Sequence, residues 1–215
     1  LGFSHEIGAI VGPVQFRSDY GRSNNEETNF GNTGIGIGLI HYINFAYKAD
    51  CNCYSTDTYF NDHFKLRSEI SWNKTKLNHY GEWVSPDKTS DAADKLRAHS
   101  GEAQNFDIGM QLEYFPLSIR SFQAFSYRFA PFVSLGIHYT SYNPKSGTTY
   151  GDGNVLNENN IYSYWYENET FLPAIPLGEQ REYPINLDSG SIWSIVASVG
   201  VRYKLTHLSD LMLDL

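Results

Sequence analysis

The sequence predicts an all-β chain whose antiparallel strands form a barrel, and three observations lead to this fold class. Tyr, Phe and Gly are abundant, at 16, 13 and 18 residues, while charged residues make up only 19% of the 215-residue chain. Such a composition favours strands over helices. Seven segments alternate apolar and polar side chains with the period of two that is typical of a strand. The connections between these segments alternate between long and shorter ones.

The strands are predicted in order along the chain, and each has one apolar face. Residues 64–73 show the clearest pattern, because Phe64, Leu66 and Trp72 share one face while Lys65 and Arg67 share the other. The first strand alternates weakly, and the seventh has no turn signal after it, so we expect further residues to complete an eighth strand. The predicted ranges are 6–16, 34–39, 64–73, 106–114, 129–140, 195–205 and a seventh strand that begins at 211.

The second predicted strand lies in an unusual stretch, residues 32–40, that reads Asn-Thr-Gly-Ile-Gly-Ile-Gly-Leu-Ile. A phosphate-binding loop is one interpretation, but such a loop needs a strand before the glycines and a helix after them. Here a polar run precedes the glycines, and His41 to Phe45 continue the strand pattern. The stretch therefore predicts a strand with one bulky apolar face and one bare face.

The connections indicate where the strands lie. When the strands are numbered in order, all the long connections fall on one side of the sheet. Outer-membrane barrels have long outer loops, short periplasmic turns and an even number of strands, from eight upward. We therefore predict a single domain, 1–215, that forms a transmembrane up-and-down barrel of eight strands. Its long extracellular loops are 17–32, 79–102 and 144–190, and its shorter connections are 46–62, 117–128 and 206–210.

The two faces of the strands favour a membrane barrel over a soluble one. The apolar faces end in aromatic residues such as Trp72, Tyr114 and Tyr203, as expected at two lipid–water interfaces. An eight-stranded barrel is narrow enough for side chains to fill it, and glycines would make room for large charged groups. The alternative is a soluble lipocalin-like barrel or β-sandwich, with the apolar face inside. We expect a lumen charge network formed by Lys65, Arg67, Glu69, Asp107, Glu113, Arg202, Lys204 and Asp214.

Charge and hydropathy exclude some classes of protein. The net charge of −8 and the pI of about 5.3 argue against a nucleic-acid partner. The sequence contains no run of 18 apolar residues, so it predicts no membrane helix. The chain starts at Leu1 rather than at Met, so we expect an exported protein whose signal peptide has been removed, with a trimmed chain as the other explanation.

The sequence offers no candidate catalytic, cofactor-binding or metal-binding residues. Cys51 and Cys53 are one residue apart, so they are either joined in a tight disulfide or present as free thiols. A C-x-C pair alone lacks the ligands that a zinc site needs. His63 and His79 lie at predicted strand ends without a serine or cysteine arrangement beside them. His138 lies on an inward face, where we expect a structural imidazole. The chain is therefore expected not to be an enzyme.

Several motifs resemble those of a known family. Residues 4–8 read Ser-His-Glu-Ile-Gly, residues 208–215 read Leu-Ser-Asp-Leu-Met-Leu-Asp-Leu, and the second strand alternates with glycine. Together with the hairpin pattern of residues 106–115 and 129–133, they resemble PorG-type outer-membrane proteins of the Bacteroidetes type IX secretion and gliding machinery. The resemblance covers most strands and little of the loops, and the chain departs from the family in lacking an eighth strand. It implies a bacterial outer-membrane location and contact with periplasmic ring proteins, a lipoprotein and its partner.

These expectations give a functional hypothesis. The chain would be a non-enzymatic anchor or scaffold of a type IX secretion or gliding complex, contacting periplasmic partners through segments 46–62 and 117–128. Segment 46–62 is rich in aromatic residues, and exposed aromatic residues suit protein contacts. The alternative is an ordinary structured loop whose aromatic residues pack on the barrel rim. Other hypotheses are a small pore or carrier that uses the lumen, and an adhesin that uses the outer loops. The candidate contact residues are Tyr47, Tyr54, Tyr59 and Phe60.

Overall fold

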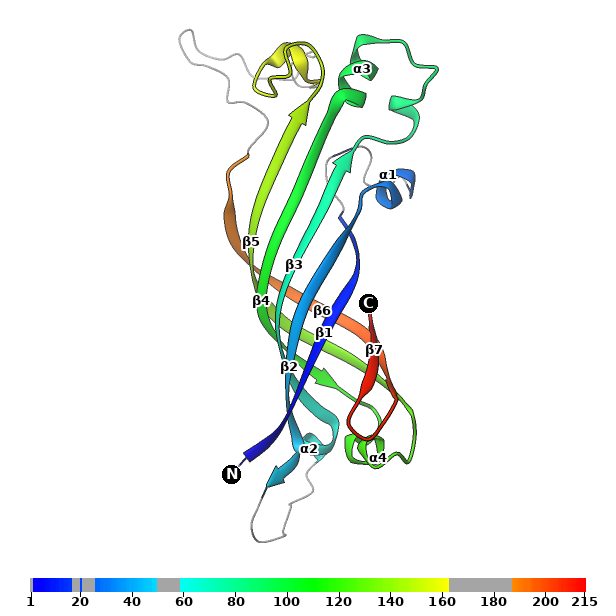
Figure 1. Ribbon diagram of the computed structural model, residues 1–215, viewed down its shortest axis with the longest axis vertical. Helices are drawn as coiled ribbons and strands as arrows, with labels where there is room; N and C mark the ends of the chain where they lie inside the picture. The colour runs from blue at the N-terminus through cyan, green and yellow to red at the C-terminus, as the bar shows by residue number, and fades with distance from the viewer. Residues whose placement is uncertain (1, 17–19, 21–25, 50–58, 163–186) are drawn as a thin grey trace.

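A computed structural model describes residues 2–16, 20, 26–49, 59–162 and 187–215. It contains one antiparallel sheet of seven strands in the order β1–β7, in which each strand pairs with the next one along the chain. The sheet curls into a half-barrel, and short helices lie at its two ends (Figure 1). The predicted all-β antiparallel fold is therefore confirmed for the described residues.

The strands are long, and the helices that accompany them are short. The strands are β1 Gly2–Gln15, β2 Thr33–Ala49, β3 Phe64–Asn78, β4 His99–Tyr114, β5 Phe129–Thr148, β6 Gly190–Lys204 and β7 Asp210–Asp214. Near one end, which we call the upper end, lie α1 Glu26–Gly31, η1 Glu82–Val84, α3 Asp91–Ala98 and η2 Glu158–Asn160. At the lower end lie α2 Tyr59–His63 and α4 Ile119–Gln123.

Several of the predicted loop boundaries need correction, because strands extend into them. β4 begins at His99 and β5 runs to Thr148, and these two residues pair with each other. β2 likewise runs to Ala49, β6 begins at Gly190 and β7 begins at Asp210, so strand residues also lie inside the predicted connections 46–62 and 206–210 and at the far end of 144–190. The predicted loops 79–102 and 144–190 contain the extensions of β4 and β5. Polar residues occupy both faces of the extended part, so the alternation that reveals a strand in the sequence is absent there.

The apolar faces of the strands point outward, away from the concave side of the sheet. On β5, Val133, Leu135 and Ile137 are 48%, 62% and 56% exposed, whereas Phe132 and Ser134, on the opposite face, are buried. The same alternation holds on β4, where Ile108, Met110 and Leu112 are exposed, and Gln111 and Glu113 are buried. A soluble barrel or sandwich buries its apolar face, so this sheet has the opposite polarity.

Aromatic residues border the exposed apolar band at both ends. They face each other in register across neighbouring strands, with ring centroids 4.9 to 5.2 Å apart in three of the four pairs. From one border to the other the band spans nine residues on β3 and eleven on β6. The lower pairs are Phe64 with Tyr114 and Phe129 with Tyr203, and the upper pairs are Trp72 with Phe106 and Tyr139 with Trp193.

Charged residues reappear on the outer face directly above the upper aromatic border. Lys74 Nζ lies 2.7 Å from Glu102 Oε2, and Lys145 Nζ lies 3.6 Å from Glu102 Oε1. These residues come from β3, β4 and β5, so they form a row across the sheet. The row marks the upper limit of the apolar band.

The concave face holds a small apolar core at its lower end. The helix α4 contributes Ile119 and Phe122, which are almost completely buried among residues of β2, β5 and the start of the segment after β4. Ser118 caps this helix, because its side chain accepts a hydrogen bond from the Ser121 amide. The helix thereby fills the lower end of the half-barrel, and the core consists of Ala46, Phe115, Ile119, Phe122, Ala130 and Phe132.

Glycines on the concave face make room for large side chains on the adjacent strand. A methyl group at Gly109 would collide with the His138 ring, and one at Gly200 would collide with the Phe132 ring. Each glycine pairs in register with the residue that it accommodates. Glycine on the concave face is thus explained by the large side chains that crowd the interior.

Candidate functional site on the concave face of the sheet

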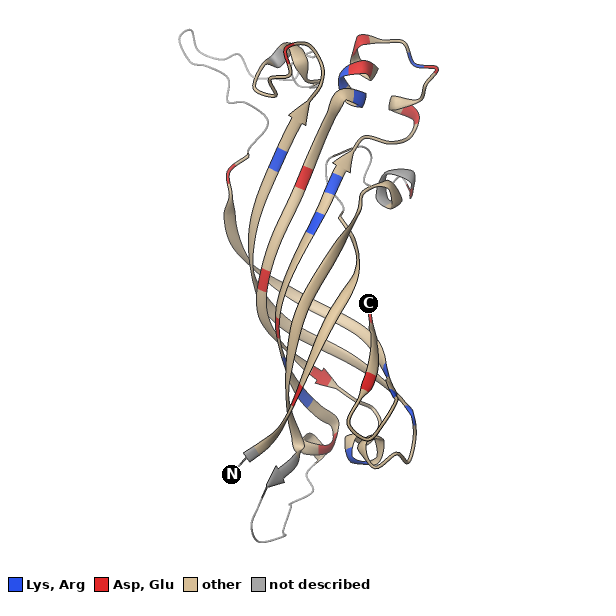
Figure 2. Ribbon diagram, in the orientation of Figure 1, with Lys and Arg blue, Asp and Glu red and all other residues tan. Residues whose placement is uncertain are grey.

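Ion-paired charged side chains lie on the concave face next to the apolar core. Figure 2 shows charged residues on several strands in the lower part of the half-barrel. Arg202 on β6 is only 2% exposed and lies at the centre of this group. Its Nη2 is 3.0 Å from Glu113 Oε2, and its Nη1 is 3.2 Å from Glu6 Oε2 and 3.5 Å from Asp210 Oδ2. One guanidinium therefore joins carboxylates from three other strands, β1, β4 and β7.

A second arginine and a lysine complete the network. Arg67 on β3 pairs with Glu69 at 2.5 Å and with Asp214, and its Nη1 is 3.6 Å from Glu113 Oε1. Lys65 Nζ is 2.7 Å from Glu6 Oε1. Because unpaired charges are costly to bury, mutual neutralisation of this kind is what allows them inside the sheet.

Six of the eight residues predicted for the lumen network meet in this cluster, and two lie apart from its ion pairs. Asp107 lies higher on β4, where its carboxylate accepts hydrogen bonds from Thr140 Oγ1 at 2.5 Å and Asn73 Nδ2 at 3.3 Å. Lys204 Nζ lies over the Phe122 ring, 5.1 Å from its centroid. The six that meet are Lys65, Arg67, Glu69, Glu113, Arg202 and Asp214.

Two carboxylates of the network escaped the sequence prediction. Glu6 lies on the weakly alternating first strand. Gly8 and Gly12 share its face and carry no polar side chain, so the sequence does not mark that face as polar. Asp210 opens β7 directly after the turn, so no alternation precedes it.

Aromatic rings separate the charged network from the core below it. The Arg202 guanidinium carbon lies 4.1 Å from the Tyr42 ring centroid and 5.5 Å from that of Phe115. Gln123 of α4 donates a hydrogen bond from Nε2 to Glu6 Oε1 at 3.2 Å, which ties the helix to the network. Such cation–π contacts stabilise a buried guanidinium. Ion pairs, rings and α4 together crowd the lower half of the concave side.

The half-barrel has an open seam between its first and last strands. β1 and β7 are the two edges of the described sheet. A cavity of about 620 Å³ lies along the seam, with Glu6 and Ile10 on one side and Leu211 and Met212 on the other. The Arg202–Glu6 ion pair crosses the seam at its lower end.

The candidate contact residues that the structure describes lie on the lower rim. Tyr59 is 63% exposed, and its hydroxyl is 2.7 Å from that of Tyr114. Phe60 is 46% exposed and stacks on Phe64 with centroids 4.7 Å apart. Both side chains therefore pack on the rim and still present surface to a neighbour. The Tyr47 side chain, Tyr54, Cys51 and Cys53 lie outside the described residues.

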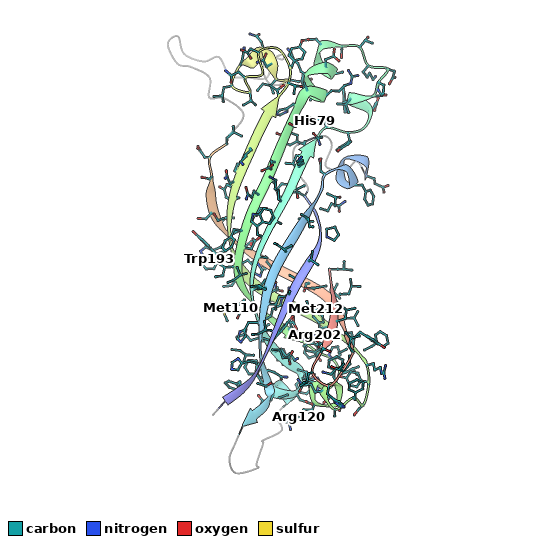
Figure 3. All side chains as sticks on the ribbon, viewed as in Figure 1. His79, Met110, Arg120, Trp193, Arg202 and Met212 are labelled. Atoms are coloured by element: carbon teal, nitrogen blue, oxygen red, sulfur yellow. The ribbon has the colours of Figure 1, made fainter. Side chains whose placement is uncertain are left out.

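A second polar cluster lies near the upper end of the sheet, around Tyr20, His79, His99 and Ser146, and we call this region the upper mouth. Figure 3 labels His79 there. Ser146 Oγ lies 2.8 Å from His99 Nε2, and His99 Nδ1 lies 3.3 Å from His79 Nε2. The Tyr20 ring is stacked on His99 and tilted against His79, with its centroid 5.0 Å from that of each imidazole. The four residues border a cavity of about 570 Å³.

Burial shifts the protonation of this upper cluster. It lowers the pKa of His79 to about 4, with the neighbouring His99 as a smaller cause, and it also lowers the pKa of His99. It raises the pKa of Tyr20, against a smaller opposite effect of the hydrogen bond with Ser146. Both imidazoles are therefore neutral and the phenol is protonated at neutral pH. Sequence spacing hid the Ser146–His99 pair, because 47 positions separate the two residues.

The remaining candidate features are structural or absent from the described part of the chain. His138 is buried and accepts a hydrogen bond from Gln111 Nε2 at 3.1 Å. Among the described residues no group of three or more His, Cys, Asp or Glu is arranged to hold a metal ion. Nor does any helix there have the length and apolarity to cross a membrane.

Comparisons with protein-family models, curated proteins and solved structures found no match.

Proposed function

We propose that this chain is a bacterial outer-membrane β-barrel whose convex face contacts lipid. The observation that carries the proposal is the inverted polarity of the sheet, with an apolar band outside and paired charges inside. A transmembrane β-strand needs about 9–11 tilted residues to cross the hydrocarbon core, and the band spans nine or eleven. The aromatic pairs at both borders fit the headgroup level.

A membrane barrel must also be closed. Unpaired backbone groups along β1 and β7 are not tolerated in hydrocarbon, so the seam has to be filled by further strand structure. The Arg202–Glu6 ion pair links β6 to β1 across the concave side, and on this proposal one further strand beside β7 completes the barrel. An eighth strand gives the even number that bacterial barrels have.

The crowded interior supports an anchoring role over a conducting one. Ion pairs, aromatic rings and α4 crowd the lower half of the concave side beside the seam cavity, and this crowding favours an anchor over an open pore. On this account the barrel is a scaffold subunit of a protein secretion or gliding complex, of the PorG type that the sequence motifs resemble. Planar-bilayer recording distinguishes the two roles: an anchor gives no stable conductance, and a small pore or carrier does.

The lower rim is the proposed docking surface for the periplasmic ring proteins, the lipoprotein and its partner. Tyr59 and Phe60, which belong to segment 46–62, present aromatic surface there, and segment 117–128 is the second proposed contact. Replacing Tyr54, Tyr59 and Phe60 together by serine should abolish co-purification of partners after mild detergent extraction. The variant should still migrate as a heat-modifiable barrel on a gel. Trp83→Ser, at the exposed upper end, is the matched control. Unchanged co-purification of the triple variant would contradict the docking surface, and an adhesin role would then be tested with the outer loops.

A further inference from the structure

The upper mouth contains an arrangement that anchoring does not require. Ser146 on β5 and His99 on β4 share a hydrogen bond of 2.8 Å, and His79, which follows β3, reaches the other nitrogen of the same imidazole. In the tautomer in which His99 Nδ1–H donates to His79 Nε2, His99 Nε2 carries no proton and accepts that of the Ser146 hydroxyl. A serine activated by a base that a third group orients is the arrangement of nucleophilic catalysis.

The Tyr20 hydroxyl completes the set. It lies 3.2 Å from Ser146 Oγ and 3.4 Å from His99 Nε2, on the same side of the cluster. The Tyr20 ring covers the bare Gly101, where a methyl group would collide with it, so the ring is held against β4. A protonated phenol beside a nucleophile is placed to donate to a developing oxyanion.

We propose that the upper mouth is an acyl-ester hydrolase site in which Ser146 is the nucleophile. His99 is the general base, Tyr20 is the oxyanion donor, and His79 is a positioning residue. The cavity of about 570 Å³ falls within the size range of small-molecule sites. Its apolar lining, from Leu77, Pro144 and Ile161, suits the acyl chain of a small carboxylic ester.

The reaction balances without any further cofactor. Ser146 Oγ bonds to the ester carbonyl carbon while its proton passes to His99 Nε2 and the carbonyl electron pair moves onto oxygen, facing Tyr20. Collapse of this intermediate breaks the ester C–O bond, and the leaving alcohol takes the proton from His99. Water then attacks the acyl-serine carbonyl carbon and gives one proton to His99 Nε2. The bond from this carbon to Ser146 Oγ breaks, His99 returns the proton to Ser146 Oγ, and the carboxylic acid is released.

The protonation states agree with these roles. The lowered pKa values of His99 and His79 keep both imidazoles neutral, so His99 can accept a proton at pH 7. The raised pKa of Tyr20 keeps its hydroxyl as a donor. This site goes beyond the proposed anchoring role, and it departs from the sequence-based expectation that the chain is not an enzyme.

The test is a covalent one on the full chain, folded in detergent micelles. A fluorophosphonate probe is added, and the modified residue is identified by peptide mass spectrometry. The expected result is an adduct on Ser146 that Ser146→Ala removes and that Ser134→Ala leaves unchanged. Ser134 is the matched control because it lies on the same face of β5 and is hydrogen-bonded to Gln111 rather than to a histidine.

Rates separate catalysis from mere accessibility. Removing a general base costs about 100-fold or more, so His99→Gln should slow both labelling and p-nitrophenyl butyrate hydrolysis by about that factor. Tyr20→Phe should slow hydrolysis by a comparable factor, about 100-fold. His79→Phe should slow it as well, whereas His79→Gln, whose side-chain oxygen can still accept from His99, should restore it.

Two outcomes would overturn the proposal. One is the absence of a Ser146 adduct on chain that is heat-modifiable and hence folded. The other is an adduct that forms equally fast in the folded His99→Gln variant. Neither outcome touches the anchoring role, which is measured by lipid contact and partner co-purification.

Discussion

Arg202 Nη2 lies 3.0 Å from Glu113 Oε2, and the two side chains are only 2% and 0% exposed although 89 positions separate them. Their strands, β6 and β4, are not neighbours in the sheet, so the pair crosses the concave side rather than following a strand ladder. The curvature of the half-barrel brings these two groups together. Arg202 also pairs with Glu6, so this guanidinium links β4 and β6 to β1 at the seam.

Breaking this pair on one side should destabilise the protein strongly. Glu113→Leu leaves Arg202 as a buried charge with fewer partners, and the expected loss in the free energy of unfolding is about 3–5 kcal/mol. Urea unfolding in micelles, followed by heat-modifiability on a gel, measures it. The double variant Glu113→Leu/Arg202→Leu should recover part of the loss, and Asp91→Asn, in the exposed pair with Lys95, should change stability by less than about 1 kcal/mol. Equal effects at both sites would contradict a buried network.

The apolar band should reject a charge according to depth. Leu135 lies at the middle of the band on β5, so Leu135→Arg should cost about 2–4 kcal/mol of stability in a bilayer. Gln104→Arg, at the level of the charged row formed by Lys74, Glu102 and Lys145, should cost about 0–1 kcal/mol. Reversible unfolding in lipid vesicles compares the two. A similar cost at both positions would mean that hydrocarbon does not surround the band.

The glycines of the concave face should differ sharply in their tolerance. Gly109→Ala places a methyl group against the His138 ring and the Ile137 carbonyl oxygen, so we expect a loss of about 1–3 kcal/mol from overpacking. Gly12→Ala is the control, since no atom lies within 4 Å of the added group. Parallel urea titrations decide the matter, and a destabilisation of Gly12→Ala as large as that of Gly109→Ala would refute the packing explanation.

The upper mouth should be sensitive to acid. The pKa of His79 is about 4 in the folded chain, below the ordinary value of 6.5, so the unfolded chain binds the proton first as the pH falls. Stability from this group is complete above about pH 6.5 and is lost progressively toward pH 4. NMR titration of the His79 imidazole should show it neutral at pH 5.5. A midpoint near 6.5 in the folded protein would contradict its burial between Tyr20 and His99.

The alternation of side chains made the strands and their polarity predictable. Adjacent positions alone reveal two unlike faces, as in Leu66 and Arg67 or Ile108 and Asp107. The alternating glycines of residues 34–38 indicate that one of these faces is crowded. These are local signals, and they were sufficient for the seven strands and for most of the charges that meet inside.

The contacts that depend on distant pairing were not predictable in this way. Glu6 joins Lys65 and Arg202 only because the sheet curls, and Ser146 meets His99 only because β5 extends past the apolar band. The helix α4 is five residues long, and its sequence gives no sign that it fills the barrel end. Register and curvature set these relationships, and neither is written in a short window of residues.

The central claim is that the outward face of the strands contacts lipid, and adjacent residues of β5 test it most directly. Single cysteines at positions 133, 134 and 135, in a background with Cys51 and Cys53 replaced by serine, can carry an environment-sensitive fluorophore. In vesicles that contain spin-labelled acyl chains, the probes at Val133 and Leu135 should be quenched and blue-shifted, while the probe at Ser134 should be protected. Strong quenching at Ser134, or none at Val133 and Leu135 in a folded, vesicle-bound chain, would contradict it.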